Sequence, residues 1–108
     1  DKEACAHCHM HVGEPRFAAQ LQTQEGDILN FDDPGCLLRY QAEQHRVVHA
    51  IYFHHHREDR WLTGRDTVFV PVEPTPMGYN LGAAASGVLG ALSYEEATRK
   101  VVASGATP

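Results

Sequence analysis

The sequence predicts an α+β fold made of two small, similar halves. Several short segments alternate between apolar and polar residues, as strands do, and two segments carry helix-capping signals. These elements follow the order strand–strand–helix–strand and then strand–strand–helix, which indicates two ββαβ-like units. We place the first unit in residues 1–58 and the second, which lacks a final strand, in residues 59–108.

The first unit is predicted to contain a hairpin and a third strand. Residues 16–24 show partial alternation, residues 25–27 (Glu-Gly-Asp) are typical of a turn, and residues 28–31 form the returning strand. Residues 47–54 are rich in β-branched and aromatic side chains, which favours a strand.

Two helices are predicted from their capping residues. Asp33 is the expected N-cap of the first helix, with Pro34 at its first position and its end near Gln44. Ser93 and Glu96 form a capping box at the start of a final helix that runs to residue 104. Its expected apolar face consists of Tyr94, Ala97, Val101 and Val102.

The second unit contains two further predicted strands. Residues 67–72 form one strand, which Pro71 places near a sheet edge, and residues 79–86 form another with small side chains. Trp61 and Leu62 are expected to extend or pair with the third strand of the first unit, with Trp61 in the core.

The composition is that of a folded, water-soluble protein, with 43% hydrophobic and 21% charged residues among 108. A net charge of −5 and the lack of a Lys/Arg cluster argue against a nucleic-acid-binding surface. No apolar run reaches the length of about 18 residues that a membrane-spanning helix needs. Because the chain begins at Asp1 rather than Met, we expect that a preceding segment was removed or left out.

The strongest chemical signal lies near the N-terminus, in the segment Cys-Ala-His-Cys-His-Met-His from Cys5 to His11. If this segment is extended, Cys8 and Met10 project to the same face, because side chains alternate along a strand. A thiolate beside a thioether suits a soft cation and favours Cu(I) over zinc. The segment therefore predicts a Cu(I) site, and whether His7, His9 or His11 contributes a ligand stays open.

Three other interpretations of the same segment remain. Cys5 and Cys8 are spaced as in a disulfide or redox pair, and with the neighbouring histidines they could bind zinc. Cys5-x-x-Cys8-His9 also matches the attachment motif of c-type haem, with Met77 as a distant second ligand. Strand patterning in residues 16–31 and 47–72 argues against the haem alternative, because small cytochromes c are mainly helical.

Other candidates have structural explanations of equal or greater weight. Met77 lies on a loop restricted by Pro74 and Pro76, where it is either a third soft ligand or a residue that fills the core. Cys36 is expected to be a buried thiol in the first turn of a helix. The triplet from His54 to His56 is either a second metal site or, as we favour, a solvated strand end.

Several motifs follow one another in a recognisable order: Cys5-x-x-Cys8-His9-Met10, Arg16-Phe17-Ala18-Ala19, Phe31 to Tyr40 (FDDPGCLLRY), Trp61-Leu62-Thr63-Gly64-Arg65, Thr75-Pro76-Met77-Gly78, an Ala-rich stretch and the final helix. In this combination the chain resembles the NosL family, the copper chaperones of nitrous oxide reductase assembly, along nearly its whole length. The histidine triplet departs from what this resemblance leads us to expect.

The resemblance implies a fold of two ββαβ-type halves related to organomercurial lyase. It also implies that the family's Cys-x-Met ligands correspond to Cys8 and Met10 and its Met-Gly loop to Met77, with Cys5 as a further candidate ligand.

By the same resemblance, the protein is periplasmic or otherwise extracytoplasmic and lipid-anchored in its full-length form. It would pass Cu(I) to a copper-receiving metalloprotein or to an ABC-transporter-linked assembly complex. We therefore expect a metallochaperone rather than an enzyme. A c-type haem electron-transfer protein, a thiol-dependent enzyme and a zinc-binding domain are the alternatives.

Overall fold

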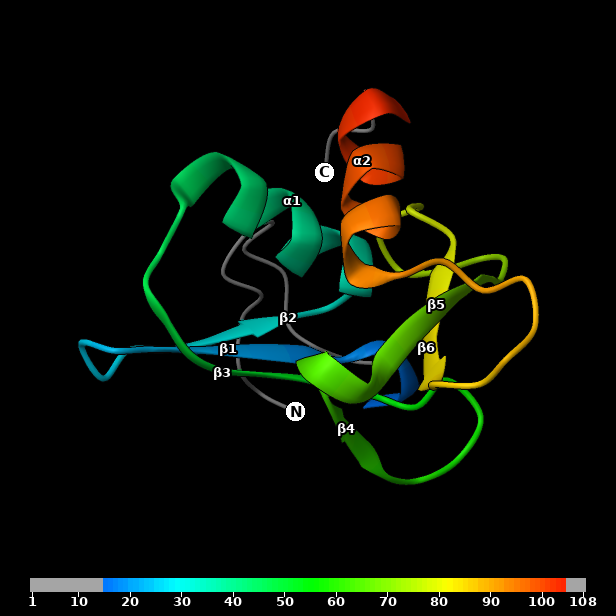
Figure 1. Cartoon of the computed structure of the whole chain (residues 1–108), viewed down its shortest axis with the longest axis horizontal. Helices are drawn as coiled ribbons and strands as arrows, with labels where there is room; N and C mark the ends of the chain where they lie inside the picture. The colour runs from blue at the N-terminus through cyan, green and yellow to red at the C-terminus, as the bar shows by residue number, and fades with distance from the viewer. Residues whose placement is uncertain (1–14, 105–108) are drawn as a thin grey trace.

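The computed structural model describes residues 15–104, which form an α+β fold of two antiparallel sheets and two α-helices (Figure 1). The predicted fold class is therefore confirmed at this level. A four-stranded sheet has the strand order β2-β1-β3-β4, and a two-stranded sheet contains β5 and β6. Both helices lie on the same side of the larger sheet (Figure 1).

The larger sheet consists of β1 (Ala19–Thr23), β2 (Ile28–Phe31), β3 (Val48–His54) and β4 (Trp61–Thr63). The smaller sheet consists of β5 (Thr67–Pro71) and β6 (Leu81–Ala85). The helices are α1 (Pro34–Gln44) and α2 (Tyr94–Ser104), and two short 3-10 turns are η1 (Pro15–Phe17) and η2 (Gly64–Asp66).

Most predicted elements are confirmed to within a few residues, and the capping signals explain the helix starts. Asp33 caps α1, and its Oδ1 accepts a 3.1 Å hydrogen bond from the Gly35 N–H. At α2, Ser93 Oγ accepts from the Glu96 N–H at 3.1 Å and Glu96 Oε1 accepts from the Ser93 N–H at 2.9 Å. In the first hairpin, Gly26 adopts a φ of 103°, which glycine tolerates.

Three sequence-based expectations are wrong in detail. The predicted strand of residues 16–24 begins later, because residues 15–17 form η1. Trp61 is 51% exposed rather than in the core, because the alternation of β4 turns Leu62 inward in its place. Val102 is also 51% exposed, because Val101 occupies the core position of α2.

A single core joins both sheets and both helices. Leu21, Phe31 and Phe53 contribute the inner face of the larger sheet, and all three are fully buried. The rings of Phe53 and Phe69 meet edge to face with centroids 5.0 Å apart, which connects β3 to β5. The predicted boundary at residues 58 and 59 lies in the loop between β3 and β4, and β4 pairs with β3.

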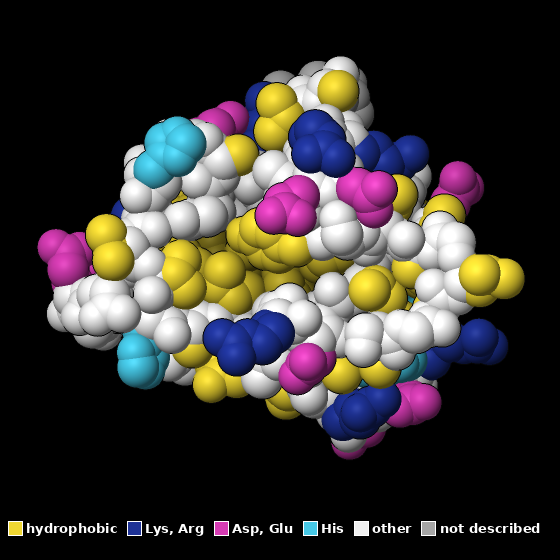
Figure 2. Space-filling view, viewed as in Figure 1, with side chains coloured by type: hydrophobic (Ala, Val, Ile, Leu, Met, Phe, Trp, Pro, Cys, Tyr) yellow, Lys and Arg dark blue, Asp and Glu magenta, His cyan; other side chains and the backbone are white. Residues whose placement is uncertain are grey.

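A second junction between the sheets lies next to β3. His55 forms a parallel bridge with Ala83, and the main-chain N–H of His56 donates to the Ala83 carbonyl at 2.9 Å. Between the helices and the larger sheet, the surface is hollowed into a groove with an apolar floor (Figure 2). Among residues 15–104, neither helix has the length and apolar character needed to cross a membrane.

Candidate functional site

Met77 is the one predicted metal ligand that the structure describes. The other proposed ligands, Cys5, Cys8 and Met10, lie outside the described residues. The neighbouring histidines His7, His9 and His11 lie outside them as well. The position of Met77 can therefore be examined from its surroundings, whereas the geometry of the complete site stays a prediction.

The loop that carries Met77 connects β5 to β6 and is held by its own hydrogen bonds. The Gly78 N–H donates to the Thr75 carbonyl at 3.0 Å, which closes a turn around Pro76 and Met77. The Asn80 N–H donates to Thr75 Oγ1 at 2.8 Å, and the Thr75 N–H donates to Asn80 Oδ1 at 3.3 Å. The two reciprocal bonds fix the width of the loop at its base.

Asp33 attaches this loop to the start of α1. Its Oδ2 accepts a 3.0 Å hydrogen bond from the Met77 N–H, while its Oδ1 serves as the helix cap. The Asp33 side chain is fully buried, so neither bond competes with bulk water. One carboxylate thus fixes the main chain of Met77 relative to the start of a helix that lies more than 40 residues earlier in the sequence.

The environment of Asp33 opposes its ionisation. Burial raises the pKa of the Asp33 carboxyl above its ordinary value, and the hydrogen bonds that it accepts act in the opposite direction. These bonds come from the Thr75 hydroxyl and from the main-chain N–H groups of Gly35, Met77 and Tyr79. The carboxyl is therefore held by four donors in a site that water does not reach.

Tyr79 packs on the first turn of α1, where only glycine fits. A Cβ atom at Gly35 would lie 2.2 Å from Cγ of Tyr79, which is far inside van der Waals contact. Burial raises the pKa of Tyr79 to about 12, with the Arg39 guanidinium acting in the opposite direction. The neighbouring Cys36 is fully buried, as the sequence predicted for a core thiol.

The result is a methionine with a fixed main chain and a partly exposed side chain. Met77 is half-buried and packs against the core cluster. Its thioether is a neutral, soft donor, and the anchored loop limits the positions that it can reach. Within residues 15–104, no group of three or more His, Cys, Asp or Glu side chains is arranged to hold a metal ion.

The histidine triplet is built into the fold rather than solvated as we expected. His54 and His55 are both buried, and His54 donates from Nδ1 to the His55 carbonyl at 2.8 Å. His55 Nδ1 accepts from the N–H groups of Arg57 at 3.0 Å and Glu58 at 3.1 Å. His56 Nδ1 lies 2.8 Å from the Ala83 carbonyl.

The triplet therefore has a structural role that its sequence does not reveal. Its ring nitrogens order the turn after β3 and attach it to β6, and the rings of His55 and His56 stack with centroids 5.2 Å apart. With His55 Nδ1 occupied by two donors, that atom has no lone pair left for a metal.

The sequence did not reveal the second role of Asp33. The Asp-Pro-Gly pattern predicts a helix cap, which accounts for one carboxylate oxygen only. The bond to Met77 spans 44 residues, so no local pattern could predict it. The resemblance places Asp33 and Met77 in two separate motifs and gives no sign that they meet.

No protein-family model, no curated protein and no solved structure matches this chain. Assignment to the NosL family is therefore a proposal that depends on the ordered motifs of the sequence.

Proposed function

We propose that this protein is a NosL-like metallochaperone that carries Cu(I) as cargo and delivers it for assembly of a copper enzyme such as nitrous oxide reductase. The proposed ligands are Cys8, Met10 and Met77, with Cys5 next to them. The fold of the NosL and organomercurial lyase proteins is part of this proposal, since the structure establishes the α+β class alone.

The observation that supports it best is the anchoring of Met77 by Asp33. A carrier site needs a ligand with a defined position that an incoming partner can still approach. The Asp33 bond at 3.0 Å fixes the main chain of Met77, while the side chain stays partly exposed.

The ligand chemistry fits transfer better than storage. One thiolate and two thioethers give Cu(I) a soft, low-coordinate site. An incoming ligand can enter such a site before the first ligands leave, so the metal can pass through a shared intermediate. Copper would also connect the N-terminal segment to the Met77 loop and so couple metal loading to the order of both.

The strand content of the described residues supports copper over haem. Six strands in two sheets occupy residues 15–104, whereas small cytochromes c are mainly helical. The proposed setting is the periplasm or another extracytoplasmic compartment, with a lipid anchor in the full-length protein. The proposed partner is a copper-receiving metalloprotein or an ABC-transporter-linked assembly complex.

An anaerobic Cu(I) titration against bicinchoninate tests the proposal. Reduced wild type should take one equivalent, and Cys8→Ser, Met10→Leu and Met77→Leu should each lower the affinity by about tenfold or more. Leucine is close to methionine in volume, so Met77→Leu removes the sulfur with little change in packing.

The matched control is Cys36→Ala, which removes a buried thiol that has no part in the proposed site. This variant should retain wild-type affinity. If wild type fails to compete with bicinchoninate, the carrier proposal is wrong. If the affinity depends on Cys5 and Cys8 but not on the methionines, a zinc site or thiol chemistry replaces it.

A further inference from the structure

A groove separate from the Met77 loop lies between β3, η2 and the start of α2. It has a volume of about 810 Å³ and is lined by residues 48–52, 63–68 and 93–95. This volume is in the range of small-molecule sites in proteins. None of its lining residues belongs to the Met77 loop, so the groove is separate from that loop.

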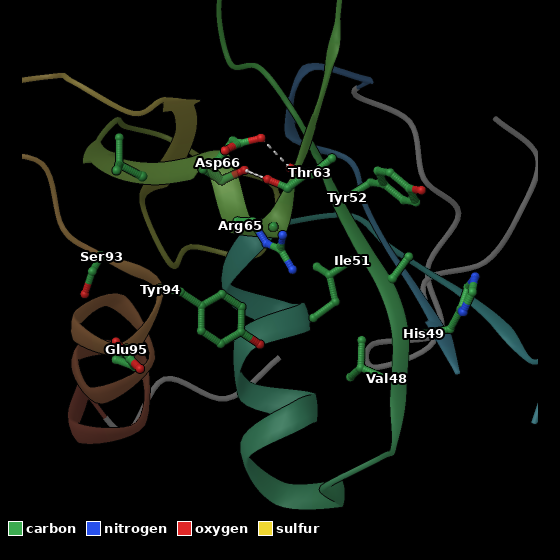
Figure 3. Close-up of a pocket in the computed structure, with 14 residues that line it drawn as sticks. Val48, His49, Ile51, Tyr52, Thr63, Arg65, Asp66, Ser93, Tyr94 and Glu95 are labelled. Atoms are coloured by element: carbon green, nitrogen blue, oxygen red, sulfur yellow. Dashed lines mark hydrogen bonds between the residues drawn. The ribbon is translucent and has the colours of Figure 1, made fainter. Parts of the chain in front are cut away.

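The floor of the groove is apolar because three half-buried side chains extend the core to the surface there. Val48, Ile51 and Tyr94 line the groove (Figure 3) and pack against the core cluster. The Tyr94 ring meets the Phe53 ring edge to face with centroids 6.5 Å apart, so a buried core residue supports the position of Tyr94. An apolar ligand body placed here would continue the packing of the core.

Residues of β3 form one side of the groove. Ala50 lies opposite Gln22 and Val48 opposite Thr23, so His49 is an extra residue that bulges from the strand. On the other side, β4 pairs with residues 52–54 of β3 alone. This bulge lies in the pairing with β1, so the groove borders the opposite edge of β3, beyond its pairing with β4.

Polar groups from opposite walls point into this apolar space. Figure 3 shows the Arg65 guanidinium and the Tyr94 hydroxyl directed toward the gap in front of Ile51. None of the ion pairs formed among residues 15–104 includes Arg65. Burial raises the pKa of Tyr94, so its hydroxyl remains a hydrogen-bond donor at neutral pH.

The two carboxylates on the rim do not neutralise Arg65. Asp66 accepts a 2.9 Å hydrogen bond from the Thr63 hydroxyl, and Figure 3 shows it turned away from the gap. Glu95 is exposed on the first turn of α2, across the groove. A ligand anion at the centre would therefore meet a guanidinium that forms no ion pair with a carboxylate of residues 15–104.

We propose that this groove binds a small amphipathic carboxylate, with its apolar body on Val48, Ile51 and Tyr94 and its carboxylate on Arg65. Guanidinium and carboxylate form two parallel hydrogen bonds, which gives the site its preference for this head group. The Tyr94 hydroxyl supplies a further donor from the opposite wall. The apolar floor selects a phenylalkyl or short alkyl body, whose removal from water supplies the remaining affinity.

The test uses 4-phenylbutyrate as the probe, with 4-phenylbutylamine as its cationic analogue and 4-phenylbutanol as its neutral analogue. Titration of the ¹⁵N-labelled full chain, followed by two-dimensional NMR, gives both the affinity and the location. The acid should bind most tightly, and the shifted resonances should include residues 48–52, 63–68 and 93–95. Equal affinities for acid and amine, or shifts confined to other residues, would overturn the proposal.

Variants at Arg65 separate charge recognition from general hydrophobic binding. Arg65→Gln should lower the affinity for 4-phenylbutyrate by about tenfold and leave the affinity for 4-phenylbutanol unchanged. Arg65→Glu should reverse the preference in favour of the amine. Arg57→Gln is the matched control, because it removes the same charge from an exposed residue outside this groove. An equal effect of Arg57→Gln and Arg65→Gln would contradict the assignment, and circular dichroism confirms that each variant is folded.

Discussion

The Asp33 carboxylate joins the first turn of α1 to the main chain of Met77 across 44 residues of sequence. Its Oδ1 accepts a hydrogen bond from the Gly35 N–H at 3.1 Å, and its Oδ2 accepts one from the Met77 N–H at 3.0 Å. Both bonds are buried, so each donor would lose its partner if the carboxylate were removed. The start of a helix and the proposed ligand loop therefore depend on one side chain.

Replacement of Asp33 should destabilise the protein more than replacement of an exposed aspartate. Asp33→Ala removes the helix cap and leaves buried N–H groups without acceptors, so we expect the free energy of unfolding to fall by about 2–3 kcal/mol. Urea unfolding followed by circular dichroism measures this change. Asp66→Ala, which removes one exposed hydrogen bond to Thr63, is the control. It should lower the free energy of unfolding by less than about 1 kcal/mol. Equal losses would show that Asp33 does not anchor the loop.

The contact between Gly35 and Tyr79 predicts a specific steric conflict. Gly35→Ala places a methyl group within 2.2 Å of the Tyr79 ring, and we expect a loss of about 1–3 kcal/mol from overpacking. In a Tyr79→Gly background the same change should have a much smaller effect, because the ring and the Tyr79 Cβ atom, which would lie 2.3 Å from the new methyl group, are both gone. A double-mutant cycle measured by urea unfolding gives the coupling between the two sites. Additive effects would mean that the methyl group is accommodated by other movements.

Stability should depend on the protonation of His55. Burial lowers the pKa of His55 from 6.5, because the imidazolium would be desolvated and could not accept from Arg57 and Glu58. The unfolded chain therefore binds this proton more readily than the folded protein does. The contribution of His55 to stability is fully present above pH 6.5 and is lost as the pH falls through the lower folded-state pKa.

A non-titrating substitute for His55 isolates this effect. In His55→Asn the side-chain oxygen can take over the acceptor role of Nδ1, so stability should change less between about pH 7 and pH 5 than in wild type. Urea midpoints measured across this range provide the comparison. His49→Asn, at an exposed position on β3, should retain the wild-type dependence. An unchanged slope in His55→Asn would assign the pH dependence to other groups.

The exposure of Trp61 predicts that it contributes little to folding. Trp61→Ala should lower the free energy of unfolding by about 1 kcal/mol or less, because Trp61 is 51% exposed and meets the His54 ring only edge to face. Phe53→Ala should cost about 3–5 kcal/mol, since Phe53 is fully buried between the two sheets. Chemical unfolding monitored by circular dichroism compares them, and similar losses would place Trp61 in the core after all.

The sequence alone predicted most elements and the starts of both helices, because these depend on local physics. Asp33 and Pro34 at α1, and Ser93 with Glu96 at α2, satisfy helix-terminal donors within a few residues of themselves. Alternation along β1 and the glycine turn at Gly26 likewise act within one hairpin. The predicted soft ligands also follow from residue type, and the ligand set stays a prediction for residues 1–14.

Tertiary structure decided how distant residues meet, and no local pattern encodes that. Asp33 bonds to Met77, and the His54–His56 segment attaches to Ala83, because two sheets share one core. The same packing buries Leu62 and leaves Trp61 exposed, although tryptophan has the larger apolar surface. The groove at Arg65 lies where residues 48–51 of β3 extend beyond the pairing with β4, which is a feature of strand pairing rather than of either strand. Local preferences fix each element, whereas burial of their apolar faces against each other fixes which side chains share a site.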